Sequence, residues 1–227
     1  MSQLRCNGKV PTIVFGKVAR DIVACKEVVD WLQCPVSGFE DFIVIITDSA
    51  VEYEERIDAF LQSVVNGRLH YMVLDMNDSL DRQRFRNKWM SYNIIGGNKV
   101  ETVIQLLHNI YAHILKTGMI SYDFTDLQYI LKQGCWVQSV CFKGELSDWV
   151  KSFQIQANAS YSFGLTLNFD DGERVKDNLD VLHEWLCRLG NNPEVKISLQ
   201  PDEDEDMETI VIWTYDDEYC KQSKIGY

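Results

Sequence analysis

The feature that most constrains the fold of this chain is the run Phe42–Thr47, which reads Phe-Ile-Val-Ile-Ile-Thr. It has no apolar–polar alternation, so a strand formed here is expected to be buried on both faces, as in parallel sheets that helices cover on both sides. Two further apolar runs, Val10–Phe15 and Leu69–Leu74, have a similar character. The three segments predict the strands of a small parallel sheet.

Helical patterns lie between these strands. Apolar residues recur at helical spacing over Val18–Leu32, and a second amphipathic pattern covers Glu52–Val65 and ends at Asn66-Gly67. Strands that alternate with helices favour parallel pairing through right-handed crossovers. The first 75 residues are therefore expected to form an α/β unit.

Two further helices follow this unit. Asn77-Asp78-Ser79 can cap a helix that runs to about Met90. After a turn at Gly96-Gly97, the longest helical pattern of the chain covers about Asn98–Lys116. Its apolar positions spread widely around the helix, which favours a central helix that contacts layers on two sides.

From Cys135 onward the pattern changes to an α+β layer with a mixed sheet. Alternating or apolar segments predict strands at Trp136–Phe142, Phe163–Phe169, Glu194–Leu199 and Glu208–Thr214. Helical patterns cover Glu145–Phe153 and Arg174–Leu189. No internal repeat or low-complexity linker separates the two parts, so they are expected to pack tightly through the central helix.

Composition excludes several classes of protein. With 46% hydrophobic and 25% charged residues, the sequence is typical of a globular protein. No apolar run approaches the roughly 20 residues that cross a bilayer, and the amino terminus has no signal-peptide core. The seven cysteines are scattered and form no Cys-x-x-Cys pair, which favours reduced thiols and a cytoplasmic location.

The formal net charge of −12 opposes binding to nucleic acid or to an anionic membrane. One segment runs against this trend, because Arg82, Arg84, Arg86 and Lys88 place four cations within seven residues. Such a cluster is most often a solvated helix face. The functional alternative is a contact for an acidic tail or groove of a protein partner.

The junction before the next helix carries two carboxylates three residues apart, Asp123 and Asp126. Asp123 stands where an N-cap belongs, and Asp126 lies in the first helical turn, where unpaired backbone N–H groups favour a negative charge. On spacing alone this is an ordinary acidic helix start.

The wider segment Gly118–Leu127 resembles the synergy loop of the FtsZ/tubulin family, which reads Gly-Leu-Ile-Asn-x-Asp-Phe-Ala-Asp-Val. The glycine, the phenylalanine and both aspartates are kept, whereas Ser121 replaces the asparagine. Gly164–Asn168 is similar to the Gly-Val-Leu-Val-Asn strand of the family, and Asn77–Leu80 to its Asn-Asp-x-Leu. The resemblance is collinear over roughly residues 40–214.

The resemblance implies a reduced member of that family. Its glycine-rich loops hold GTP phosphates on backbone N–H groups at a helix N-terminus, and neither they nor a Walker loop occurs here. The expected fold is α/β and FtsZ/tubulin-like, with a small parallel sheet, a central helix and an α+β C-terminal domain. The expected boundaries are 1–95 for the reduced α/β half, 96–117 for the central helix, 118–214 for the α+β domain and 215–227 for an acidic tail.

In the family, hydrolysis needs two subunits, because one binds GTP and the next supplies aspartates that position and polarise the attacking water. The resemblance therefore implies no nucleotide cofactor and no catalysis by this chain alone, and the spacing of the histidines predicts no metal site. Asp123 and Asp126 would act in trans, on an FtsZ/tubulin-like GTPase or on another copy. The expected partner-binding residues are Ser121, Asp123, Asp126, Arg82, Arg84, Arg86 and Lys88.

Three functions stay open from the sequence. The first is a non-nucleotide-binding protein that caps or stimulates a polymerising GTPase, and the second is a divergent GTP-binding protein with remodelled phosphate loops. The third is an assembly subunit that reuses the fold. A metal enzyme is disfavoured, because His108 and His113 lie five residues apart on the central helix and do not share a face.

Overall fold

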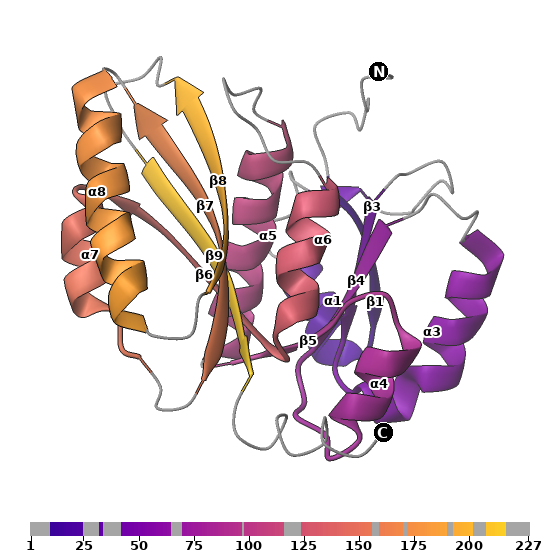
Figure 1. Cartoon of the computed structure of the whole chain (residues 1–227). Coiled ribbons are helices and arrows are strands. Elements are labelled where there is room, and N and C mark those ends of the chain that lie inside the picture. The colour runs from indigo at the N-terminus through magenta and orange to yellow at the C-terminus, as the bar shows by residue number, and fades with distance from the viewer. Residues whose placement is uncertain are drawn as a thin grey trace.

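The apolar runs of the first half form the parallel part of a nine-stranded sheet (Figure 1). The structure is a computed structural model that describes residues 10–24, 32–33, 42–64, 70–96, 98–115, 124–155, 159–169, 172–189, 193–201 and 208–216. The strands are β1 (Val10–Phe15), β2 (Leu32–Gln33), β3 (Phe42–Thr47), β4 (His70–Asp75), β5 (Tyr92–Ile95), β6 (Trp136–Lys143), β7 (Ser160–Phe169), β8 (Glu194–Pro201) and β9 (Glu208–Asp216). The helices are α1 (Lys17–Val23), α3 (Ala50–Val64), α4 (Arg82–Lys88), α5 (Lys99–Leu115), α6 (Phe124–Gln133), α7 (Leu146–Ser152) and α8 (Gly172–Leu189).

The strand order is β2-β1-β3-β4-β5-β6-β9-β7-β8. Neighbours from β2 to β6 are parallel, whereas β9 is antiparallel to both β6 and β7. Because Ile94 of β5 pairs with Trp136 of β6, the sheet continues from the parallel half into the C-terminal half. The predicted α/β class, with a parallel half and a mixed C-terminal half, is confirmed. The predicted domain boundaries stay predictions.

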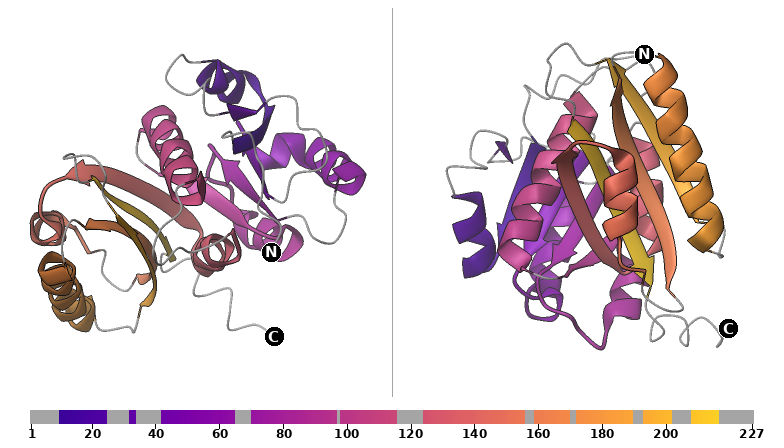
Figure 2. Two further views of the ribbon diagram at one scale, coloured as in Figure 1. Left: turned by 90° about the horizontal axis from the view of Figure 1, so that it is seen from above. Right: turned by 90° about the vertical axis from the view of Figure 1, so that its left-hand side faces the viewer.

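Helices cover both faces of this sheet, as the continuous apolar runs require. All six residues of β3 are buried, with Phe42, Val44 and Ile46 against α1, α5 and α6. Ile43 and Ile45 point to the opposite face and pack under α3 and α4. In the C-terminal half, α7 and α8 cover a third, aromatic-rich core. Helices α5 and α6 lie between the two halves (Figures 1 and 2).

The predicted helix Val18–Leu32 is wrong at its C-terminal end. Helix α1 ends at Val23, and Leu32–Gln33 instead forms strand β2, which pairs with Val10 and Pro11 of β1. A strand of two residues has no period of its own, so the apolar Leu32 fitted the helical spacing equally well.

Strand β5 was absent from the prediction because a polar residue interrupts a short apolar run. Asn93 is completely buried in that strand, and its Nδ2 donates to the carbonyl oxygens of Leu131 and Gly134, at 2.8 and 2.9 Å. These partners lie about forty residues away in the sequence. The two hydrogen bonds offset the free-energy cost of removing the amide from water.

Helix α4 is shorter than predicted, because it begins at Arg82 with Asp81 as its N-cap. The predicted cap residues Asn77–Ser79 lie in the segment that follows β4. There the backbone N–H of Asn77 donates to Oδ1 of Asp75 at 2.9 Å. Among the helices that the structure describes, none combines the length and apolar character needed to cross a membrane.

Candidate functional site

The strand order reverses at β1, which is where an open α/β sheet forms a ligand crevice. From β1 the chain passes to β2 on one side, and β3 then pairs with the other side of β1. Ligands of such sheets bind outside the carboxyl ends of the strands at this switch point. Here those ends are followed by Gly16 after β1 and by Asp48 after β3.

The carboxylate of Asp48 occupies this position. Its Oδ2 accepts the backbone N–H of Val18 at 3.0 Å, and its Oδ1 accepts that of Ala19 at 2.7 Å. Gly16 has a φ of 118°, and a Cβ atom on it would lie 2.2 Å from Cγ of Asp48. Glycine is therefore required for the carboxylate to reach the first N–H groups of α1.

Further carboxylates lie at the same edge of the sheet. Ser49 Oγ accepts the N–H of Glu52 at 3.3 Å, so the first turn of α3 contains its own cap and an acidic side chain. At the end of β4, Asp75 is completely buried and accepts the hydroxyl of Tyr92 at 2.7 Å. Burial raises the pKa of Asp75, although this hydrogen bond opposes the rise. The edge thus carries negative charge where a phosphate would have to sit.

Exposed apolar side chains surround these carboxylates. Val18, Val51, Leu80 and Val100 follow the carboxyl ends of β1, β3, β4 and β5, in that order. They are four of the seven large apolar side chains that are exposed among the described residues, and Leu80 is 84% exposed. Because adjacent strands are roughly 5 Å apart, the four segments span about 15 Å. We call these four residues the apolar rim.

The predicted basic cluster on α4 is paired within the chain. Arg84 binds Glu54 of α3, and Lys88 lies 2.5 Å from both Glu54 and Asp58. Arg82 is buried and lies 3.5 Å from Asp78. The spacing of the cations was visible in the sequence. Their pairing was not, because Glu54 lies 30 positions from Arg84 and 34 positions from Lys88. A contact of this helix with an acidic partner stays a prediction.

Arg86 connects the two halves of the molecule. Its Nη1 lies 3.0 Å from Oδ1 of Asp216, at the end of β9, and 3.2 Å from Sγ of Cys135. Its Nη2 donates to the carbonyl oxygen of Lys132 at 3.0 Å. The guanidinium is 11% exposed and the Asp216 side chain 2%, so this is a buried structural ion pair.

Asp126 lies in the first turn of α6, as predicted, whereas Ser121 and Asp123 lie outside the described residues. Its Oδ1 is 2.9 Å from Nζ of Lys196 on β8, and both side chains remain about one-third exposed. The same ammonium lies over the ring of Tyr129, 5.4 Å from the centroid. Asp126 is therefore reachable by a partner but already has an ionic partner in the chain.

The amino end of α6 and the apolar rim lie at opposite edges of the parallel sheet. Gln128, in the second turn of α6, binds the side chain of His70, which is the first residue of β4. Asn93 of β5 binds the carbonyl oxygen of Leu131, further along α6. Helix α6 thus begins at the amino ends of the strands, away from the edge that carries Asp48 (Figure 1).

Asp48 was not among the site residues predicted from the sequence. Among the described residues, no group of three or more metal-ligating side chains occurs. Two signals could have identified Asp48. It follows a strand that is buried on both faces, and Gly16 stands at the corresponding place after β1. What the sequence cannot show is that these two strands are neighbours.

Comparison with known proteins identifies the fold. No protein-family model matches the sequence, and no curated protein matches it. CetZ from Methanosaeta thermophila matches with a TM-score of 0.54 and 9% identity, over 82% of this chain and 65% of that one. TubZ of Bacillus thuringiensis matches in a four-stranded filament with a TM-score of 0.51 and 11% identity, over 82% of this chain and 64% of TubZ.

A second TubZ structure, of GDP-form protofilaments from serovar israelensis, matches with a TM-score of 0.50 and 8% identity, over 82% of this chain and 65% of that one. The chain therefore spans slightly less than two thirds of the length of these proteins. At such low identity the likeness shows the fold alone, which is the tubulin/FtsZ fold.

Proposed function

We propose that this chain is a tubulin/FtsZ-like protein that binds no nucleotide in its own sheet and acts through protein–protein contacts. The observation that carries the proposal is the Asp48 carboxylate on the first N–H groups of α1. A phosphate at this switch point would need the same donors. The carboxylate already uses them, and it adds a like charge that repels the ligand.

The apolar rim supports a protein contact at the same edge. A side chain as exposed as Leu80 is unfavourable in water and becomes favourable when a partner covers it, by about 2 kcal/mol for a leucine. The three valines of the rim would add further apolar area to the same contact. Carboxylates around the rim would then select the partner by charge rather than bind a phosphate.

We propose a subunit with the same fold as the partner, because the TubZ matches are described as protofilaments and as a four-stranded filament. This chain would occupy one end of such a filament. If it contacts the partner through the rim, it would cap growth. If Asp126 instead faces the partner's nucleotide, it would stimulate hydrolysis in trans, and the ion pair with Lys196 would have to open first.

Thermal unfolding with and without GTP or GDP, each with Mg²⁺, tests the absence of a nucleotide site. A ligand at about 100 times its Kd stabilises a protein by roughly 2.7 kcal/mol, which is a readily measured rise in melting temperature. We expect no rise at millimolar nucleotide. A rise that grows with nucleotide concentration would instead support a GTP-binding protein with remodelled loops.

Light scattering and phosphate release by a TubZ or FtsZ protein, with this chain added in substoichiometric amounts, test the contact. Capping lowers scattering and phosphate release together, whereas stimulation in trans raises phosphate release. Leu80→Ser should weaken the effect, and Leu179→Ser, at an exposed leucine on α8, is the matched control. If the two variants weaken the effect equally, the apolar rim is not the surface that contacts the partner.

A further inference from the structure

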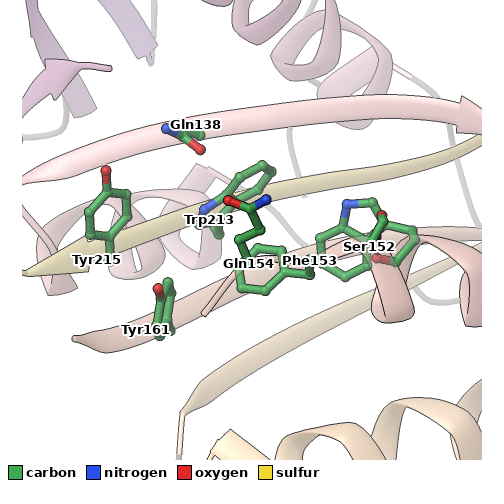
Figure 3. Close-up of a pocket in the computed structure, with 8 residues that line it drawn as sticks. Gln138, Ser152, Phe153, Gln154, Tyr161, Trp213 and Tyr215 are labelled. Atoms are coloured by element: carbon green, nitrogen blue, oxygen red, sulfur yellow. Dashed lines mark hydrogen bonds between the residues drawn. The ribbon is translucent and has the colours of Figure 1, made fainter. Parts of the chain in front are cut away.

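A hollow on the C-terminal half carries an inference that is independent of the switch point. It has a volume of about 230 Å³ and opens between the end of α7 and the sheet (Figure 3). The residues that line it come from β6, α7, β7, β9 and the segment after α7. They are Gln138, Trp149, Ser152, Phe153, Gln154, Tyr161, Trp213 and Tyr215.

The base of the hollow is formed by aromatic rings of the third core, of which Tyr161 and Tyr215 are buried and three others are partly exposed, Trp149, Phe153 and Trp213. The ring of Trp213 meets Trp149 edge to face at 6.1 Å and Phe153 at 5.6 Å. Phe153 meets Tyr161 at 5.7 Å, and Tyr161 lies 5.7 Å from Tyr215. Since these rings contact one another, each is held in place by its neighbours, and the surface is formed before any ligand arrives.

The margin of the hollow is polar but uncharged. The hydroxyls of Tyr161 and Tyr215 point toward the side on which Gln138 lies, and the amide of Gln154 projects over Phe153 (Figure 3). Neither glutamine amide has a hydrogen-bond partner among the described residues. Among the residues that the structure describes, no charged side chain lines the hollow. It therefore suits a neutral ligand that carries hydrogen-bond acceptors close to apolar rings.

We propose that this hollow docks a proline-rich segment of a partner protein in the polyproline II conformation. Such a segment has no internal hydrogen bonds, so its carbonyl groups need donors. The two glutamine amides can supply them. Its pyrrolidine rings pack on aromatic faces, and its stiffness keeps the entropy loss on binding small, which is how aromatic-lined grooves recognise proline-rich peptides.

Size and composition favour this occupant over two others. The volume lies below the roughly 300–1,000 Å³ of pockets that enclose a whole small molecule, so a ring from a longer ligand fits better. A charged peptide motif would find no opposite charge in the lining. The 227 residues contain four prolines, at positions 11, 35, 193 and 201, and no Pro-x-x-Pro pattern, so none of these segments supplies the ligand.

Calorimetric titration of the full chain with decaproline, together with amide chemical shifts from nuclear magnetic resonance, tests this proposal. We expect saturable binding and shifts that concentrate on Trp149–Gln154 and Tyr215. Gln154→Ala removes one donor from an exposed side chain and should weaken binding about three- to tenfold, the value of one hydrogen bond. Gln83→Ala on α4 is the matched control and should leave the affinity unchanged.

Three results would overturn the proposal. The first is an absence of saturable binding at millimolar decaproline, and the second is an equal response to a glycine–serine peptide of the same length. The third is binding of free indole but not of decaproline, which would assign the hollow to small aromatic ligands. The hollow lies away from the carboxyl ends of the parallel strands. An absence of peptide binding would therefore not change the outcome expected for the nucleotide test.

Discussion

The carboxyl edge of the parallel half and the hollow of the C-terminal half treat polar groups in opposite ways. At the parallel edge, the chain's own carboxylates accept the available donors, as Asp48 does for α1 and Asp75 does for Tyr92. In the hollow, the amides of Gln138 and Gln154 face the cavity. Within one fold, a polar region can therefore be closed by the chain's own side chains or left open, depending on which side chains the neighbouring strands supply.

The largest expected effect concerns the ion pair that joins the two halves. Arg86→Ala leaves the carboxylate of Asp216 buried without its charge partner, so we expect a loss of about 3–5 kcal/mol in the free energy of unfolding. Urea denaturation followed by circular dichroism measures it. As a control, Arg84→Ala removes a half-exposed cation from the same helix and should lose at most about 1 kcal/mol. Equal losses would show that the halves do not depend on this contact.

A smaller effect is expected when the closed edge is opened. Asp48→Ala leaves two N–H groups of α1 without an acceptor, so the free energy of unfolding should fall by about 0.5–2 kcal/mol. The sharper readout is phosphate binding by the variant, measured by calorimetry. Phosphate that binds the variant and not the native chain would show that the carboxylate closes an anion site. Glu55→Ala, at an exposed carboxylate on α3, is a control that leaves this edge unchanged.

The buried carboxylate of the same edge predicts a pH dependence. Burial raises the pKa of Asp75 above the ordinary 3.8, so the folded state binds its proton more tightly than the unfolded state does. Its contribution to stability is complete below pH 3.8 and is lost as the pH rises through the folded-state pKa. The free energy of unfolding of the native chain minus that of Asp75→Asn should therefore decrease as the pH rises above 3.8 in parallel urea titrations. A difference that rises with pH would contradict the assignment.

The smallest effect on stability is expected from Lys196→Ala. Both members of its pair with Asp126 are partly exposed, and water screens such contacts, so the melting temperature should hardly change. The variant removes the ion pair between Lys196 and Asp126 at the amino ends of the strands. If the chain stimulates a partner's hydrolysis, phosphate release should increase with this variant. Unchanged release, with the native chain active, would show that the ion pair with Lys196 does not limit any action of Asp126 on the partner.

Particular residues show how far the sequence could predict this molecule. The unbroken apolar run of β3 requires burial on both faces, and the period of α5 requires contacts on two sides, so both were correctly predicted. Strand β5 was missed, because the buried Asn93 depends on carbonyl groups that only the folded chain brings near. The cations of α4 were identified as a cluster, but their carboxylate partners on α3 were not.

Most of the helices and strands, and with them the α/β class, could be predicted from the sequence, because hydrophobic period and turn residues act over a few neighbouring positions. The likeness to the tubulin/FtsZ fold came instead from short motifs such as Gly118–Leu127. Tertiary contacts place Asp48 on α1, bring Arg86 to Asp216 and join five aromatic residues in one cluster. The Asp48 contact spans 29 positions and the Arg86 contact 130. Strand order sets such contacts, and no local pattern encodes it.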